Sequence, residues 1–252
     1  MTPLFDLERV ECTRPTAGKV LLEVSACLAP GEFVALCGLN GSGKSTLLEI
    51  MVGLLRGYAG TCRFEGREVR TWPARLLARR ISFLPQSAVS AARFTSAEVV
   101  RMGRYPFAHG WYFAEQDLQI CRDAMRQAGC EELADRFVNE LSGGERQRVL
   151  FAAVLAQQPA ALLLDEPGTF IDLPHQIQMF RTLRALCAEG MLCVAATHDL
   201  NLAAAFCSRI ILLDRGCVVA DASAGAVLAS GEFRQVFGEH VRVERGRVHY
   251  EI

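Results

Sequence analysis

Short apolar runs alternate with helical patterns along most of the 252-residue chain. The runs are apolar at every position instead of every second one, which is typical of central strands covered on both faces of a sheet. They lie at residues 33–37, 81–85, 161–165, 192–197 and 209–214. The helical patterns between them are typical of crossovers from one parallel strand to the next. The sequence therefore predicts an α/β fold with a mainly parallel sheet.

One section breaks this alternation. From about residue 97 to 158, helical patterns occur at 116–128 and 144–157 and no convincing strand is visible. We expect a single domain over 1–252, with a helical subdomain at about 87–158 inserted between two strands of the core. Further helices are predicted at 45–55 and 174–189, and alternating residues around Arg245 and Gly246 predict a C-terminal hairpin.

Composition places the chain among globular proteins, because 51% of the residues are hydrophobic and 22% are charged. The net charge of −1 argues against a general nucleic-acid binder, since contacts to a phosphate backbone need clustered basic residues. Arginines do cluster at 75–80 and at 146–148, and we interpret both clusters as solvated helix faces. We therefore expect no nucleic-acid partner.

Ten cysteines are scattered along the chain, and none forms a C-x-x-C pair. This pattern favours buried free thiols in a reducing compartment over a zinc site or a disulfide scaffold. The sequence shows no signal peptide and no apolar run of the roughly 18 residues that a membrane crossing needs. We expect a soluble, cytosolic protein.

A glycine-rich loop, GLNGSGKST, carries the clearest chemistry, because it fits the pattern G-x-x-x-x-G-K-[ST]. Glycines let the backbone curl so that N–H groups face a phosphate, and the following helix start adds its dipole. Lys44 is expected to reach the β- and γ-phosphates and Ser45 to ligate Mg²⁺. The predicted contacts are Gly38, Leu39, Asn40, Gly41, Ser42, Gly43, Lys44, Ser45 and Thr46.

A second motif, ALLLDEP, follows as an apolar strand that ends in two carboxylates. Strand ends in such sheets point toward the ligand crevice. Asp165 is expected to hold Mg²⁺, and Glu166 to polarise an attacking water. The residues at 165–168 also spell D-x-x-G, a GTPase pattern, but no N-K-x-D is present to read guanine, so we treat that match as accidental.

The segment LSGGERQ at 141–147 opens a predicted helix with two adjacent glycines, and it resembles the signature of ATP-binding cassette (ABC) ATPases. The resemblance covers nearly the whole chain, because the motifs come in that family's order. Around the signature stand the phosphate loop, Gln86 after a strand, LLLDEP, Asp172 in the D-loop and His198 after a strand. This implies a P-loop NTPase core with an antiparallel β portion and a helical insertion.

The resemblance also supplies roles. Two copies would stack head to tail, with each ATP between the phosphate loop of one copy and the signature of the other. Ser142 and the backbone of Gly143 and Gly144 would then cap the γ-phosphate held by the partner, with the glycines leaving room for it. Gln86 would join the Mg²⁺ or water shell and sense the transport partner, and His198 would touch the γ-phosphate. Lys44, Glu166 and His198 form the implied catalytic set.

Two departures from the family pattern stand out. That family usually places an aromatic residue upstream of the phosphate loop, where it stacks on adenine, and residues 12–19 contain none. Arg14 could stack through its guanidinium group, and nucleobase selectivity would then be loose. The D-loop reads GTFID instead of the usual S-x-L-D type, so only Asp172 carries over.

Residues 96–111 resemble the V-x-x-G-R-x-P stretch of ATPases that serve importers of iron–siderophore, haem or cobalamin type, with matches at Val100, Gly103, Arg104 and Pro106. The other interpretation is a helix C-terminus stopped by glycine and proline. Aromatic residues in this region either dock a membrane subunit or belong to the core; they are Tyr105, Phe107, Trp111, Tyr112 and Phe113.

Together the resemblance implies an ATP- and Mg²⁺-dependent ATPase that powers an importer of a metal chelate. It implies a homodimer, transmembrane permease subunits and a substrate-binding protein as partners, and a peripheral place on the cytoplasmic face of the inner membrane. An ABC ATPase serving another cargo, or one acting in DNA repair or on ribosomes, stays open. The intact Glu166 and His198 argue against a regulatory module that does not hydrolyse ATP.

Overall fold

The computed structural model describes residues 2–15, 18–86, 93–108, 113–238, 241–244 and 247–250. Its central element is a six-stranded sheet in the order β10-β9-β3-β8-β7-β6. The strands are β3 (Phe33–Cys37), β6 (Ile81–Leu84), β7 (Ala161–Asp165), β8 (Leu192–Ala196), β9 (Arg209–Asp214) and β10 (Cys217–Ser223). All neighbours pair in parallel except β10, which is antiparallel to β9. The predicted α/β fold and its five central strands are confirmed.

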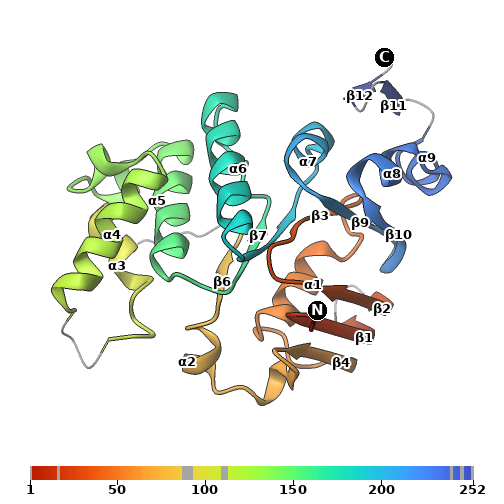
Figure 1. Ribbon diagram of the computed structural model, residues 1–252, viewed down its shortest axis with the longest axis horizontal. Helices are drawn as coiled ribbons and strands as arrows, with labels where there is room; N and C mark the ends of the chain where they lie inside the picture. The colour runs from red at the N-terminus through yellow and green to blue at the C-terminus, as the bar shows by residue number, and fades with distance from the viewer. Residues whose placement is uncertain are drawn as a thin grey trace.

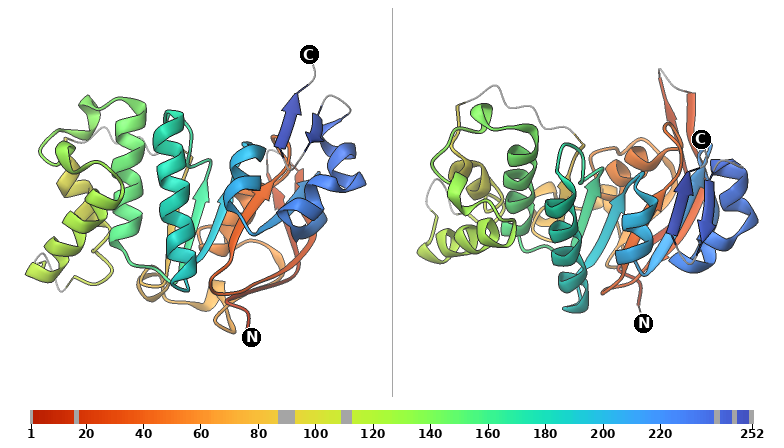
Figure 2. Two further views of the ribbon diagram at one scale, coloured as in Figure 1. Left: turned by 45° about the horizontal axis from the view of Figure 1, so that its top comes forward. Right: turned by 90° about the horizontal axis from the view of Figure 1, so that it is seen from above.

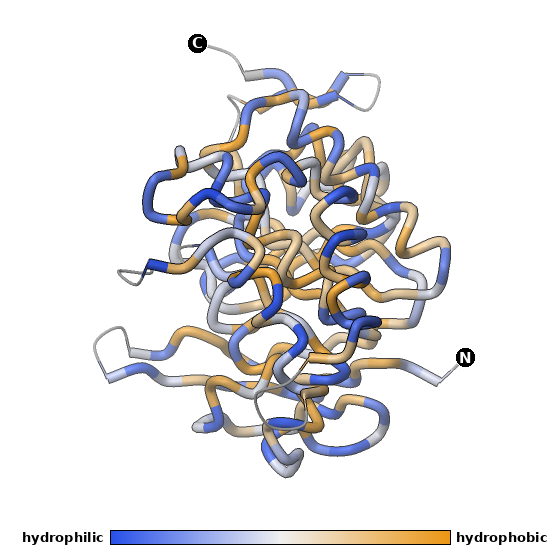
Figure 3. Tube along the Cα trace, turned by 90° about the vertical axis from the view of Figure 1, so that its left-hand side faces the viewer, coloured by the Kyte–Doolittle hydropathy of each residue, from blue (hydrophilic) through white to orange (hydrophobic). Residues whose placement is uncertain are grey.

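Complete burial explains why the central strands carry no polar alternation. Every residue of β3, β7 and β8 is buried. Alternate residues enter two separate cores: Ala35 and Cys37 face one, while Val34 and Leu36 face the other. Apolar chain therefore fills the middle of the molecule and polar chain follows its rim (Figure 3).

One of these cores is closed by a second sheet, of order β2-β1-β4-β5, and by α1 (Lys44–Met51). Its strands are β1 (Phe5–Arg14), β2 (Gly18–Leu28), β4 (Ala59–Phe64) and β5 (Arg67–Glu68), and all pair antiparallel. Sequence patterns did not locate these strands, because repeated register shifts between β1 and β2 interrupt the alternation. The sheet lies under α1 at the N-terminal side of the molecule (Figure 1).

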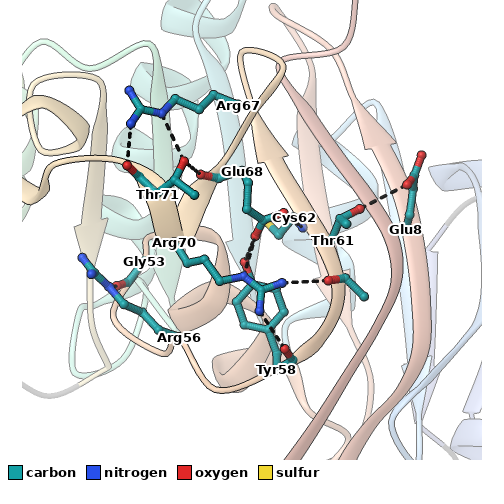
Figure 4. A network of polar contacts seen from close by, with 11 residues as sticks. Glu8, Gly53, Arg56, Tyr58, Thr61, Cys62, Arg67, Glu68, Arg70 and Thr71 are labelled. Atoms are coloured by element: carbon teal, nitrogen blue, oxygen red, sulfur yellow. Dashed lines mark hydrogen bonds and ion pairs between the residues drawn. The ribbon is translucent and has the colours of Figure 1, made fainter.

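A polar network holds the β4–β5 edge of this sheet together (Figure 4). Arg70 donates to Glu68 at 3.0 Å and to the carbonyl oxygens of Tyr58 at 3.0 Å and Gly60 at 2.8 Å. The Tyr58 hydroxyl also donates to Glu68, and burial together with that bond raises the pKa of Tyr58. The guanidinium group lies 4.1 Å from the Tyr58 ring centroid. These contacts hold the short 3₁₀ turn that contains Arg70 against the start of β4, so the role of the network is structural.

Helices cover the other core. These are α6 (Leu173–Ala188), α7 (Leu200–Phe206), α8 (Ala224–Ala229) and α9 (Gly231–Phe237). The predicted C-terminal hairpin is confirmed as β11 (Val241–Glu244) and β12 (Arg247–Tyr250), which Asn201 of α7 binds through both the N–H and the carbonyl of Val248. No helix within the described ranges has the length and apolarity that a membrane crossing requires.

Between β6 and β7 the described chain is helical and forms a lobe beside the sheets (Figures 1 and 2). Its helices are α3 (Ser96–Met102), α4 (Glu115–Gln127) and α5 (Gly143–Ala156), with short 3₁₀ turns at Glu131–Leu133 and Val138–Glu140. We call this the helical lobe. The predicted helices at 116–128 and 144–157 are confirmed within one residue at each end, whereas the helix predicted at 45–55 ends earlier, at Met51.

Two residues of the V-x-x-G-R-x-P stretch have packing roles in this lobe. A Cβ atom on Gly103 would lie 2.1 Å from the Ala153 carbonyl oxygen, so glycine lets α3 approach α5. Arg104 is buried, and it donates to Asp117 at 2.8 Å and to the Ala156 carbonyl at 3.0 Å. Tyr105 is 51% exposed and stacks on Phe113, while Trp111 and Tyr112 lie outside the described residues.

The interpretation of residues 75–80 as a solvated helix face is confirmed only in part, because Arg75 and Arg80 are exposed but Arg75 and Arg79 also bind main-chain oxygens. From α2 (Ala74–Leu77) and the turn after it, Arg75 and Arg79 donate to the Pro106 carbonyl at 3.0 and 2.8 Å, and Arg75 also donates to the Ala108 carbonyl. We call this the carbonyl clamp; it joins the sheet region to the helical lobe. The second cluster was misread too, because Arg148 is mostly buried and donates to the Gly129 carbonyl.

The prediction of buried thiols is confirmed for eight of the ten cysteines, while Cys27 is exposed and Cys217 is half-buried. Burial raises the pKa of Cys37, Cys62 and Cys130 to about 12, so these thiols are protonated at neutral pH.

Candidate functional site

The glycine-rich loop joins the end of β3 to the start of α1, where the sequence places it. Gly38 has φ +147°, and a Cβ atom there would lie 2.1 Å from the Leu213 carbonyl oxygen. Lys44 is buried, and its ammonium group donates to the carbonyls of Gly38 at 2.9 Å and Leu39 at 3.1 Å. The Ser42 hydroxyl is buried with no hydrogen-bond partner among the described residues. The loop is therefore curled around Lys44, and it holds the Ser42 hydroxyl in its interior without a hydrogen-bond partner among the described residues.

A hollow of about 380 Å³ opens beside this loop, and we call it the phosphate hollow. It brings residues from four places in the sequence together: Val20, Asn40, Gly41, Gly43, Lys44, Ser45, Thr46, Gln86, Asp165 and Glu166. The predicted positions Gly38, Leu39 and Ser42 support the loop without lining the hollow. Gln86, Asp165 and Glu166 thus lie where the sequence motifs predict them, at the carboxyl ends of β6 and β7.

The two carboxylates at the end of β7 have different surroundings. Burial raises the pKa of Asp165, and a hydrogen bond from the Ser45 side chain opposes this shift. Glu166 has φ +50°, and its N–H donates to the Ala196 carbonyl at 2.9 Å. Its carboxylate lies 2.5 Å from Nδ1 of His198, which follows β8 and is exposed. Asp165 therefore faces the phosphate loop, while Glu166 and His198 form a pair that reaches the surface.

The signature segment begins α5 with a capping box. The Ser142 hydroxyl accepts from the Glu145 N–H at 3.3 Å, and the Glu145 carboxylate accepts from the Ser142 N–H at 2.8 Å. Hydrogen bonds from Ser142 to that carboxylate, first of all from its backbone, lower the pKa of Glu145. The helix start is thus fixed by the motif's own serine and glutamate, as S-x-x-E spacing predicts.

A second hollow, of about 390 Å³, lies at this helix start, and we call it the signature hollow. Its lining includes the predicted residues Ser142, Gly143, Gly144 and Asp172. It also includes residues that were not predicted to belong to the site: Glu145, Arg148, Phe170, Ile171 and His175. The two hollows share no residue, so one chain carries a complete phosphate loop and a complete signature that line separate surfaces.

The two signature glycines are required for packing within this chain, and the sequence did not predict this requirement. A Cβ atom on Gly143 would lie 3.0 Å from the Cβ of Phe170, and one on Gly144 would lie 2.8 Å from the Phe170 carbonyl oxygen. The missing side chains of the two glycines make room for Phe170. Phe170 itself is 76% exposed and has φ +66°. The signature and the D-loop therefore pack as one unit.

Comparisons with known proteins agree with this arrangement. Residues 21–169 match the family described as ABC transporter. The hemin import ATP-binding protein HmuV of Plesiomonas shigelloides is 39% identical over 92% of this chain and 95% of its own length. The cobalamin import ATP-binding protein BtuD of Halobacterium salinarum is 40% identical over 89% of this chain and 56% of its own length.

The solved structures include MJ0796, a bacterial ABC transporter cassette, in dimeric form. It is 28% identical, with a TM-score of 0.79 over 87% of this chain and 98% of that one. The same cassette in a post-hydrolysis state, bound to ADP and Pi, has a TM-score of 0.77 over the same shares. The family match, the relatives and the phosphate hollow agree that the chain binds nucleotide. The chain belongs to the ABC transporter family, in which it is an ATP-hydrolysing cassette.

Proposed function

We propose that this chain is the ATPase subunit of an importer that takes up a metal chelate of the haem, cobalamin or iron–siderophore class. The observation that carries the proposal is the likeness to a hemin import ATP-binding protein, 39% identical across 92% of the chain. The stretch around Gly103 and Arg104 adds less than its sequence suggests, because both residues have packing roles. The family relationship therefore carries the cargo class.

The phosphate hollow fits a nucleoside triphosphate with Mg²⁺. The loop N–H groups and Lys44 bind the phosphates, because both present positive charge to one small region. Ser45, Asp165 and Gln86 line the same hollow with oxygen donors of the kind that Mg²⁺ prefers. These residues would hold the ion, which neutralises phosphate charge when it is bound.

Glu166 is the group that polarises the attacking water. Its carboxylate lines the hollow and is held by His198 at 2.5 Å, so its orientation is set before substrate arrives. His198 is exposed on the outer side of this pair and touches the γ-phosphate in the role that we propose for it. Lys44 completes the catalytic set.

A composite site explains why the two hollows are separate. In a head-to-tail homodimer, the signature hollow of one copy covers the phosphate hollow of the other. Ser142 and the helix start behind it then bring N–H groups and a dipole to the γ-phosphate. Asp172 lies at the same hollow and faces the partner copy. The solved dimer of MJ0796 supports a dimeric form of this chain.

The same proposal places the protein in a larger assembly. Two ATPase copies act with transmembrane permease subunits and a substrate-binding protein, on the cytoplasmic face of the inner membrane. The helical subdomain at about 87–158 is the part that we assign to contact with the permease. A net charge of −1 supports the absence of a nucleic-acid partner.

The cargo is tested with the chain and its co-purified permease in proteoliposomes. Hemin, cyanocobalamin and a ferric hydroxamate siderophore are offered in parallel, with ATP inside or outside. We expect ATP-dependent uptake of one of the three, lost when the ATPase carries Glu166→Gln. ATP hydrolysis without uptake of any of them would contradict the cargo class. Recovery of the native protein with ribosomes or DNA instead of membranes would favour the non-transport alternative.

A further inference from the structure

His198 lies in a short turn that is anchored on both sides. Before it, the Thr197 N–H donates to the Leu36 carbonyl of β3 at 3.2 Å. After it, the Asp199 carboxylate caps α7 by accepting from the Leu202 N–H at 2.9 Å. The Asp199 N–H also donates to the Thr197 hydroxyl at 3.1 Å. Because one capping residue is all that separates His198 from α7, the position of the first turn of α7 determines where the imidazole lies.

The helix α7 is short, and its packing is incomplete. It has seven residues, too few to be stable without tertiary contacts. Leu200 and Ala203 are buried in the core beneath it. A hollow of about 730 Å³ lies along one flank, lined by residues of α6, α7 and β12. The core therefore holds the inner side of α7, and this flank needs support from elsewhere.

The C-terminal hairpin supplies that support through one side chain. In an antiparallel pair, alternate residues turn their N–H and C=O groups away from the partner strand. Asn201, in the first turn of α7, binds both groups of Val248 as a neighbouring strand would: it accepts from the N–H at 2.9 Å and donates to the carbonyl at 3.1 Å. The Val248 side chain is 4% exposed and belongs to the core that α7 covers. The hairpin beside α7 (Figure 2) is thus fixed both to the helix and to the core.

We infer that Asn201 is a positioning residue for hydrolysis: by fixing the first turn of α7 to the hairpin, it keeps His198 in contact with Glu166. Nδ1 of His198 lies 2.5 Å from the Glu166 carboxylate, so a movement of α7 by about 1 Å would stretch this contact to the limit of a hydrogen bond. Asn201 does not line the phosphate hollow and therefore acts through His198. The inference rests on the proposed function, since it takes Glu166 and His198 to be the catalytic pair.

Asn201→Ala in two backgrounds separates positioning from general support of the fold. In the native chain it should lower kcat about three- to tenfold and leave the KM for ATP within about twofold. In a chain that already carries His198→Ala it should change the rate by less than about twofold, because the residue that it positions is gone. A purely structural role would lower both rates by the same factor. Single-turnover release of phosphate from radiolabelled ATP measures the slow rates of the second background.

Val248→Pro breaks the same contact from the side of the hairpin, because proline has no N–H to donate. It should lower kcat to a similar extent as Asn201→Ala. The double variant should be no slower than either single variant within about twofold, since both remove one contact. The matched control is Arg247→Ala, the neighbouring residue on β12, whose exposed side chain takes no part in the Asn201 contact. Its kcat should equal that of the native chain.

Four results would overturn the inference. They are an unchanged kcat in Asn201→Ala, an equal fall in the His198→Ala background, full activity of Val248→Pro, and a similar loss of kcat in Arg247→Ala. Normal turnover of the His198→Ala chain itself would count against the proposed function instead, because His198 would then not belong to the catalytic set.

Discussion

The phosphate hollow and the signature hollow have nearly the same size but are built in opposite ways. Asp165 and Glu166 are buried at the end of β7 and Lys44 is buried at the start of α1, so the sheet and the helix after β3 fix them. Ser142 and Phe170 are exposed, and a capping box and a close helix–loop contact fix them. One hollow is therefore built from strand ends and a phosphate loop, while the other is built from a helix start packed against a loop. Damage to the two should have different consequences.

The largest effect should come from the carboxylate in the phosphate hollow. Glu166→Gln keeps the shape of the side chain but removes the base, so turnover should fall roughly 10²–10⁴-fold with ATP binding retained. Phosphate release measures the first quantity and calorimetry the second. The variant should also remain dimeric with ATP on a sizing column. Near-normal turnover would show that Glu166 does not polarise the water.

The next largest effect should come from an experiment that tests whether the two hollows act in different subunits. A heterodimer of Lys44→Ala and Ser142→Arg subunits places both lesions at one composite site and leaves the other intact. It should trap about one nucleotide per dimer, while a homodimer of either variant should trap about none. Differently tagged subunits allow the heterodimer to be purified and its trapped nucleotide counted. Absence of complementation would refute the arrangement in trans.

A smaller effect should follow from Gly144→Ala in the signature hollow. The added Cβ meets the Phe170 carbonyl at 2.8 Å, so the helix start and the D-loop must separate. We expect turnover to fall by about tenfold at saturating ATP, with little change in the Kd of the monomer. Gly225→Ala is the matched control, because a Cβ there meets nothing within 4 Å. A large loss of ATP binding by the monomer would mean that the hollows are coupled within one chain.

The smallest effect should come from the carbonyl clamp, which lies outside both hollows. Removing Arg75 and Arg79 together loosens the helical lobe without touching a lining residue. Turnover should fall about two- to fivefold while the ATP Kd is unchanged. Arg80→Ala is the control, since Arg80 pairs with Glu65 on its own side of the molecule. An equal fall in turnover with Arg80→Ala would show that the carbonyl clamp has no specific role in turnover.

Sequence alone predicted the phosphate hollow well, because its parts lie at strand ends and strand ends are visible as apolar runs. Gln86, Asp165, Glu166 and His198 all lie at the end of such a run or directly after one. The signature hollow was predicted only in part. Phe170 enters it through an approach to Gly144 across 26 positions, and no periodicity encodes such a contact.

The arginine contacts also could not be predicted, because they join residues that are far apart in the sequence. A run such as 75–80 has the composition of a solvated face, and charge patterning cannot distinguish water from a main-chain carbonyl 27 residues away. The resemblance predicted an antiparallel β portion, but sequence patterns did not locate its strands, because its register shifts erase the alternation on which strand prediction depends. Local sequence patterns therefore identified the chemical motifs but not the packing contacts that surround them.

The carbonyl clamp has a consequence for how such a chain can change over generations. Arg75 and Arg79 grip main-chain oxygens, and every amino acid supplies the same oxygen. Side chains beside them, such as Tyr105 with its 51% exposure, can therefore be exchanged without loosening the joint between the lobes. The side chains on this surface can therefore change to fit a new partner protein while the ATP-hydrolysing site stays the same.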